Sequence, residues 1–420
     1  MSPFNILPSS AQKDAVKPFT VHIPDSDLER TKTLLQLSNV ADECYENAMP
    51  EGRSDLGLRR EWLIEAKRVW ETEFDWRATE AKINALPNFT APVPISRSRS
   101  NEKINIHFIG IFSQNPAAVP IVFLHGWPGS ILEFLPLFRL LLEKYPDLAS
   151  LPYHLIAPSL PGFTLSDPWP KDQHYGMQDA AQVIDSLLTS VLGFPEYVAQ
   201  GGDIGSRIGR CLASTYDSCT ACLLNFSPLP APEGFDFSTL SETEKMGVER
   251  GKWFMNHGSA YACEQATRPA TLGFALSSSP LAILAWVGEK YLEWTDPRSF
   301  PLDSGKRYSR KLMEEAIASV AFYWYTKKIH TSFWSYREAF ALNGQAPPSS
   351  NAQFPVRGPG KKFGFMWFPF EVNPVPKAWI EGYSEIRFWR SHEVGGHFAQ
   401  LEQPGVVMGD LEDFVGSLRE

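Results

Sequence analysis

Apolar side chains recur at helical spacing through the first hundred residues. Residues 25–37 begin with Asp and Ser, which cap helices well, and continue as a helical mix of charged and apolar positions. In residues 57–74, Leu58, Trp62 and Trp70 are among the apolar residues at near-helical spacing. A further helix is expected up to Leu86, before a proline. The pattern predicts helix and loop up to about residue 100.

From about residue 102, short apolar runs of strand length alternate with helical stretches. Strands are predicted at residues 104–109, 119–124, 153–157, 197–199, 221–226, 363–367 and 386–389. Helices are predicted at residues 131–145, 178–192, 204–216 and 405–418. Apolar strands that alternate with helices are typical of a mostly parallel, doubly wound sheet, so an α/β fold is expected.

The alternation breaks between residues 228 and 355. This segment has helical patterns at residues 309–321 and 322–340, with Pro- and Gly-rich borders at residues 228–232 and 344–348. Helices inserted between two strands of a sheet indicate a lid. The predicted organisation is an N-terminal extension (1–101), a core in two parts (102–227 and 356–420) and a helical lid (228–355).

Composition narrows the function class. The 420 residues include 39 Lys and Arg against 48 Asp and Glu, for a net charge of −9. Because there is no basic surplus, nucleic acid is not an expected partner, and small neutral molecules are favoured. Aromatic residues make up 13% of the chain. Core packing explains most of them, and some could line an apolar pocket.

Cysteine usage and the N-terminus bear on the compartment. Five scattered cysteines do not suggest a secreted disulfide framework, and the isolated pair Cys219 and Cys222 does not favour a redox or zinc site. The N-terminus has no signal-peptide pattern, and the apolar stretch at residues 280–288 is too short to span a membrane. A cytoplasmic protein without a membrane anchor is therefore expected.

The sharpest local motif surrounds Asp203. A predicted strand leads into Gly201-Gly202-Asp203-Ile204-Gly205, and a predicted helix follows. This is the pattern of a nucleophile elbow, in which small residues two positions before and after the nucleophile let strand and helix pass closely. Serine is the usual nucleophile there, whereas a carboxylate suits displacement at a saturated carbon. The alternative is that Asp203 only caps the following helix.

A second motif follows the predicted strand at residues 119–124. It reads His125-Gly126-Trp127-Pro128-Gly129-Ser130. In α/β-hydrolases a loop after an early strand supplies one backbone N–H of the oxyanion hole, and the residue after the nucleophile supplies the other. Trp127 and Ile204 are therefore the candidate donors.

The candidate base and acid follow in the order that α/β-hydrolases use, with nucleophile, acid and histidine in turn. His397 lies after the last predicted strand, and His392 is the alternative base. A zincin motif is excluded because these histidines are one residue too far apart and two glycines lie between them. Glu371 follows a strand and is the candidate acid, with Glu233 and Asp236 as competitors.

Taken together, these motifs resemble those of epoxide hydrolases in the α/β-hydrolase superfamily, in the microsomal-type branch that includes soluble fungal members. The resemblance covers nearly the whole chain. It rests on the oxyanion motif at residues 125–128, the elbow at 201–205, the histidine motif at 395–398 and the N-terminal run at 74–89. The N-terminal run is the most branch-specific of these.

The resemblance implies roles that spacing alone does not supply. Two lid tyrosines hold and protonate the epoxide oxygen in the family, and the motifs around Tyr261 and Tyr336 match theirs. The motif at residues 368–371 resembles the acid motif of the family, which favours Glu371. The implied reaction converts a small apolar epoxide and water to a vicinal diol, with no cofactor and no metal. The N-terminal membrane anchor of microsomal members is not matched, and a homodimer is left open.

Two other functions are compatible with an aspartate elbow. A haloalkane dehalogenase shares it but commonly places a Trp after the nucleophile to bind halide, where this chain has Ile204. A catalytically silent α/β-hydrolase that binds a ligand would be expected to have lost some of the site, whereas every position is filled. An ordinary esterase is disfavoured because the elbow lacks Ser.

Overall fold

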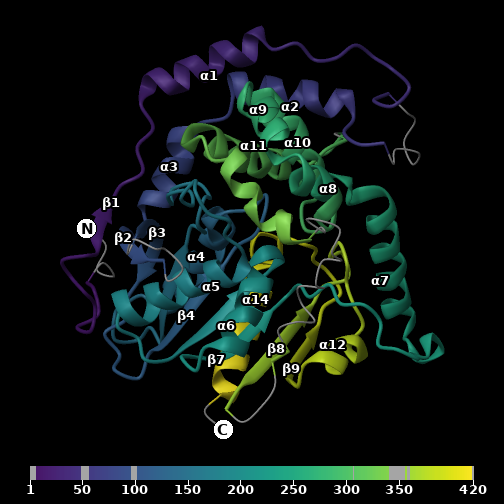
Figure 1. The fold of residues 1–420 in the computed structure, drawn as a ribbon. Coiled ribbons are helices and arrows are strands. Elements are labelled where there is room, and N and C mark those ends of the chain that lie inside the picture. The colour runs from purple at the N-terminus through teal and green to yellow at the C-terminus, as the bar shows by residue number, and fades with distance from the viewer. Residues whose placement is uncertain are drawn as a thin grey trace.

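The fold is built on a sheet of nine strands (Figure 1). The computed structural model describes residues 6–48, 56–95, 102–305, 307–339, 355–356 and 360–418. The strand order is β1-β2-β3-β5-β4-β6-β7-β8-β9. The strands are β1 (Lys17–Phe19), β2 (Asn88–Pro94), β3 (Lys103–Ile111), β4 (Val119–Leu124), β5 (Tyr153–Pro158), β6 (Tyr197–Gly201), β7 (Cys219–Leu224), β8 (Lys362–Trp367) and β9 (Ile386–Ser391).

The six strands from β4 to β9 are parallel to one another, and β3, β2 and β1 extend the sheet beyond β5 in antiparallel fashion. This confirms the predicted mostly parallel sheet. All seven strands that the apolar runs predict are present, with ends that differ by a few residues. β4 and β6 lie at the centre and are almost entirely buried, which explains their apolar sequences.

Strands β1 and β2 correct the prediction of helix and loop for the first hundred residues. Pro92 and Pro94 in β2 disfavour a strand, because proline lacks the N–H that a ladder needs. On either side of β2, Ile95 donates its backbone N–H to Glu102 O, and Pro87 O accepts the backbone N–H of Gly110 (both 3.0 Å). The odd-numbered positions of this segment are therefore the ones that hydrogen-bond toward β3. The two prolines fall on the alternate positions, which face away from β3, and β1 pairs only with Asn88–Thr90. Neither proline therefore interrupts the ladder.

Helices cover both faces of the sheet. The chain moves from β4 to β5 in one direction and from β5 through β6 to β7 in the other. Because such crossovers are right-handed, α4 lies on one face, and α5 and α6 lie on the opposite face. The core helices are η2 (Ile131–Phe134), α4 (Leu135–Lys144), α5 (Met177–Ser186), η3 (Leu187–Val191), α6 (Asp203–Thr215), α12 (Lys377–Tyr383), α13 (Ala399–Glu402) and α14 (Pro404–Ser417).

A helical segment lies between β7 and β8, where the sequence predicts the lid, and is called the lid below (Figure 1). Its elements are η4 (Phe237–Thr239), α7 (Glu242–Trp253), η5 (Phe254–Gly258), α8 (Ala260–Thr267), α9 (Pro269–Ser277), α10 (Pro280–Trp294), α11 (Arg310–Thr326) and η6 (His330–Ala339). Within the described residues no single helix is long and apolar enough to cross a membrane; α9 and α10 pass that test only as a pair bent by 117°.

The prediction of two helices at residues 309–321 and 322–340 places the boundary between them wrongly. One helix, α11, runs through the expected boundary to Thr326 and ends at Lys327, which adopts the left-handed conformation with φ of 56°. The chain then continues as the 3₁₀ segment η6. Phe340 and the predicted border at residues 344–348 lie outside the described residues.

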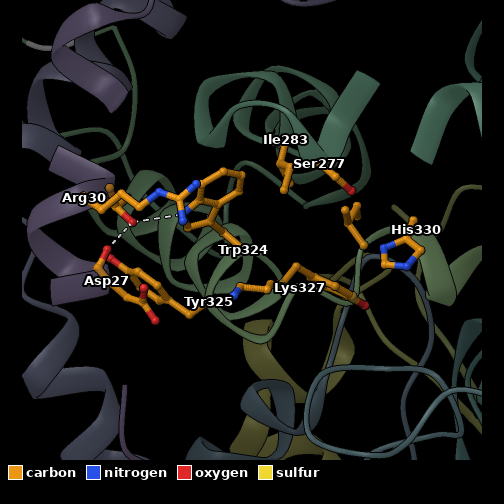
Figure 2. Close-up of a pocket in the computed structure, with 11 residues that line it drawn as sticks. Asp27, Arg30, Ser277, Ile283, Trp324, Tyr325, Lys327 and His330 are labelled. Atoms are coloured by element: carbon orange, nitrogen blue, oxygen red, sulfur yellow. Dashed lines mark hydrogen bonds between the residues drawn. The ribbon is translucent and has the colours of Figure 1, made fainter. Parts of the chain in front are cut away.

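The N-terminal helices α1 (Asp25–Leu37), α2 (Arg60–Thr72) and α3 (Trp76–Asn84) pack against the lid (Figure 1). Trp324 of α11 donates its indole N–H to Thr31 Oγ1 of α1 (2.8 Å). Beside this contact lies a cavity of about 290 Å³, and Figure 2 shows Asp27 and Arg30 on one side of it and Lys327 and His330 on another. The N-terminal segment therefore braces the lid from outside.

The close passage of β4 and α6 generates a stability prediction. A Cβ at Gly205 would overlap the backbone carbonyl oxygen of Leu124, and neither backbone can move independently of the sheet. We expect Gly205→Ala to lower the free energy of unfolding by about 3 kcal/mol through overpacking. Urea denaturation followed by circular dichroism measures it.

Gly409→Ala is the matched control. Gly409 lies in α14, where a Cβ would meet no atom within 4 Å. Replacing an unstrained helical glycine should raise stability by about 0.5–1 kcal/mol. Equal midpoints for the two variants would contradict the tight crossing.

Candidate active site

The carboxyl ends of the central strands converge on Asp203. Asp203 is the first residue of α6, directly after β6 and Gly202, and its φ is 45°. A non-glycine residue in this left-handed region costs of order 1–3 kcal/mol, which the surrounding packing must offset. The strained turn lifts the carboxylate toward the loop that follows β4.

Three glycines make room for this turn. A Cβ at Gly201 would lie 2.6 Å from the carbonyl oxygen of Gly205, and one at Gly126 would overlap the Asp203 side chain. Gly205 in turn lies against Leu124 at the end of β4. The small residues of the elbow motif are therefore required by backbone contacts around Asp203.

The loop after β4 supplies a backbone donor to the Asp203 carboxylate. Trp127 donates its backbone N–H to Asp203 Oδ1 (2.8 Å), and the backbone N–H of Ile204 also stabilises the carboxylate. Two hydroxyls of α11 pin this loop: Ser319 donates to Pro128 O (2.9 Å) and Tyr323 to Gly129 O (2.7 Å). The two predicted oxyanion donors thus converge on one side of Asp203.

His397 lies between two carboxylates. Its Nε2 is 3.5 Å from Asp203 Oδ2, and its Nδ1 is 2.5 Å from Glu371 Oε1. Glu371 follows β8, and its backbone carbonyl accepts a hydrogen bond from Arg250 Nε of α7 (2.7 Å). His397 and Glu371 are both almost fully buried, so the three groups form one continuous chain of interactions.

The competing candidates lie elsewhere. His392 pairs with Asp410, with 2.6 Å between Nε2 and Oδ2. Asp236 caps η4 by accepting the backbone N–H of Ser238, and Glu233 is exposed. The structure therefore brings Glu371 and His397 to Asp203 and leaves the three alternatives away from it.

The cysteine pair and the histidines form no metal centre in the part of the chain that is described. Cys219 and Cys222 are free thiols buried in β7, and burial raises the pKa of both. No group of three or more His, Cys, Asp or Glu side chains among the described residues is placed to hold an ion.

Electrostatics fix the charge states of the central residues. Burial disfavours the His397 imidazolium, but the charges and hydrogen bonds of Glu371 and Asp203 outweigh it and hold the pKa of His397 well above its usual value. Burial likewise opposes the Asp203 carboxylate, while His397 and the Trp127 and Ile204 N–H groups keep the pKa of Asp203 below its usual value. The resting site is an imidazolium between two carboxylates.

Tyr261 and Tyr336 face this charge cluster from the lid. Tyr261, on α8, stacks on the Trp127 ring at 5.3 Å, and the Tyr336 ring of η6 is 5.7 Å from that of Tyr261. The buried Tyr336 hydroxyl makes no hydrogen bond of ordinary length within the described residues. Burial raises the pKa of both phenols, which are therefore neutral donors.

Two residues near the centre were missed by sequence reasoning. Trp294, the last residue of α10, packs its ring against His397 (4.9 Å) and Tyr261 (5.2 Å), and its carbonyl accepts the His397 backbone N–H (2.9 Å). Glu133 of η2 lies beside Asp203 and His397. Nothing in the sequence marks either residue: Trp294 is one of 13 tryptophans, and Glu133 reads as an ordinary acidic residue in the first turn of a helix.

Comparison with known proteins decides the family. A profile described as the epoxide hydrolase N terminus matches residues 16–134, and the α/β hydrolase fold profile matches residues 119–255. The solved structure of Aspergillus niger epoxide hydrolase is 41% identical, covers 99% of this chain and 100% of its own, and superposes with a TM-score of 0.87. The chain belongs to the epoxide hydrolase family.

More distant epoxide hydrolases match over similar lengths. Epoxide hydrolase 1 of Sus scrofa is 26% identical over 98% of this chain and 91% of its own. Juvenile hormone epoxide hydrolase of Bombyx mori is 23% identical with a TM-score of 0.79, which shows the shared fold. The α/β-hydrolase fold of this epoxide hydrolase therefore agrees with the sequence expectation.

The charge arrangement predicts how His397 titrates. Asp203→Asn removes one of the two carboxylates that stabilise the imidazolium, so we expect the pKa of His397 to fall. Nuclear magnetic resonance of ¹⁵N-labelled histidine measures it, and His397→Gln assigns the signal. Asp410→Asn, which removes the partner of His392, should leave the His397 titration in place. An unchanged pKa in Asp203→Asn would contradict the coupling.

Proposed function

We propose that this epoxide hydrolase converts small apolar epoxides to vicinal diols through an ester on Asp203. The observation that carries the proposal is the arrangement around one carboxylate: a buried His397–Glu371 pair on one side, and two neutral phenols facing it from the lid. Nucleophile, base and proton donors are thus available to one substrate at the same time.

Asp203 attacks a ring carbon of the epoxide in the first step. A bond forms between Oδ and carbon, the ring C–O bond breaks, and the oxygen leaves as an alkoxide. Tyr261 and Tyr336 donate to that oxygen, because their raised pKa values keep them protonated at neutral pH. The negative charge moves from Asp203 to an oxygen held by two donors, and the product is a hydroxyalkyl ester.

Water hydrolyses this ester in the second step. His397 takes a proton from a water molecule while the oxygen of that water attacks the ester carbonyl carbon of Asp203. Glu371 stabilises the imidazolium that forms on His397. The backbone N–H groups of Trp127 and Ile204 receive the oxyanion of the tetrahedral intermediate, a contribution of about 3 kcal/mol for each donor. Collapse breaks the bond between the carbonyl carbon and the substrate oxygen, which takes the proton from the His397 imidazolium and leaves as the second hydroxyl of the diol. The regenerated Asp203 carboxyl group then gives its proton to His397, which restores the resting imidazolium.

Esterification also switches the histidine. In the resting site, His397 is held protonated by Asp203 and Glu371 together. The ester is neutral, so the pKa of His397 falls once Asp203 has reacted, and the proton it releases balances the one that the substrate oxygen gains. His397 becomes a free base at the stage that needs one.

The surroundings favour a neutral, apolar substrate. The rings of Trp127, Phe333 and Trp294 pack together beside the two tyrosines, with Trp127 6.3 Å from Phe333 and 6.5 Å from Trp294. A charged substrate would lose its hydration against these surfaces without gaining a partner. An uncharged epoxide with an aryl or alkyl substituent fits the chemistry.

His397→Gln separates the two steps. Glutamine cannot act as a base, so the ester should form and then persist. With styrene oxide as the substrate, intact-protein mass spectrometry should show a stable increase equal to one substrate mass, and diol production should fall by at least about 100-fold.

His392→Gln is the matched control, since His392 pairs with Asp410 away from the site. This variant should turn over normally and accumulate no adduct. Steady diol formation by His397→Gln would remove His397 from the role of base, and halide release from a haloalkane without diol formation from epoxides would favour a dehalogenase.

A further inference from the structure

A third carboxyl group lies beside the charge cluster, and neither step above uses it. Glu133 belongs to η2, which follows the oxyanion loop directly, and only 9% of its surface is exposed. Its side chain folds back over Gly129, where any Cβ would overlap the Glu133 carboxyl oxygen. The glycine at position 129 therefore lets the carboxyl turn inward.

Glu133 helps to enclose a small cavity. The side chains of Glu133, Asp203, His397 and Gln400 border it, together with Trp127 and Phe398. Its free volume is about 10 Å³, the space that the centre of a single water molecule needs, and far too little for an epoxide. Because the cavity touches both the nucleophile and the base, a molecule in it contacts both reacting partners of the ester hydrolysis.

We propose that Glu133 positions the water that hydrolyses the Asp203 ester, and that it does so as a neutral acid. The inference rests on the proposed two-step reaction. A water in the cavity can donate one hydrogen to His397 Nε2 and the other to the Glu133 carbonyl oxygen. Its lone pair then points at the carbonyl carbon of residue 203, which is the orientation that attack requires.

The neutral state follows from the surroundings of the carboxyl group. Burial raises the pKa of Glu133 to about 8. The nearby Asp203 carboxylate also raises this pKa, whereas the His397 imidazolium lowers it. Tyr291 of α10 and Tyr323 of α11, the other titratable groups that face it, are neutral because burial raises their pKa. A carboxylate here would repel the oxyanion that forms on residue 203, whereas the neutral acid accepts the water hydrogen without that repulsion.

The test measures each half-reaction separately in single turnovers with excess enzyme and styrene oxide. Rapid quenching and intact-protein mass spectrometry follow the formation and decay of the ester. Glu133→Leu should leave ester formation within about twofold of the unchanged protein and slow its decay by about 100-fold. Gly129→Ala, which keeps the carboxyl group but pushes it outward, should slow decay in the same way.

Glu133→Gln tests the charge state, because the amide is neutral and keeps a carbonyl acceptor. Its ester should decay at nearly the normal rate at pH 7. As the pH is raised, decay in the unchanged protein should slow as Glu133 ionises, whereas in Glu133→Gln it should not. Glu143→Leu, on the exposed side of α4, is the control and should change neither step.

The outcomes separate this inference from the reaction on which it rests. Normal ester decay in Glu133→Leu, or equal slowing of both half-reactions, would overturn the role of Glu133 while leaving the ester mechanism intact. Decay as slow in Glu133→Gln as in Glu133→Leu would overturn the neutral acid. Failure of every variant and of the unchanged protein to form an ester would instead contradict the proposed function.

Discussion

The imidazolium of His397, buried between two carboxylates, is the interaction on which the site depends. Removing three charged groups from water is costly, and their close contact and hydrogen bonds must offset that cost. Asp203 has the Trp127 N–H at 2.8 Å, and Glu371 Oε1 accepts the Val372 N–H at 2.6 Å in addition to His397. The strained backbone of Asp203 is held by the same contacts.

The lid and the core share this constraint. The loop that carries His397 is bound to Asp296, which follows the C-terminus of α10 in the lid. Gly395 donates its backbone N–H to Asp296 Oδ2 (2.9 Å). The Glu402 carboxylate accepts the backbone N–H groups of Asp296 (2.9 Å) and Phe398 (3.0 Å). The loop that carries Trp127 is bound to α11 in a similar way. Base, oxyanion donors and tyrosines therefore keep their relative positions through contacts with the lid, and the N-terminal helices brace the lid from outside.

Local chemistry decides how much could be predicted. The elbow at residues 201–205 could be predicted because the strained turn and the close contact between strand and helix are local features. They place Asp203 between two glycines at fixed spacing. Chain order led to His397, while Glu371 needed the family resemblance to prevail over Glu233 and Asp236. The roles of Tyr261 and Tyr336 also came from the resemblance, since the two residues lie 75 positions apart in the sequence and no spacing rule relates them.

The misses have physical reasons. β2 was overlooked because its prolines disfavour a strand in general, and only its register shows that they face away from β3. α11 passes its expected boundary because the apolar pattern continues until Lys327 adopts a left-handed conformation. Glu133 reads as an ordinary acidic residue in the first turn of a helix, and its inward path depends on the missing side chain at Gly129.

The most direct test of a covalent Asp203 intermediate is a single turnover in water enriched in ¹⁸O with the enzyme in excess. Hydrolysis of the ester at its carbonyl carbon predicts one heavy oxygen in the Asp203 carboxylate, found by mass spectrometry of the peptide that contains it, and unlabelled diol. Labelled diol from the first turnover, with an unlabelled Asp203 peptide, would contradict the account, because water would then have attacked the epoxide directly.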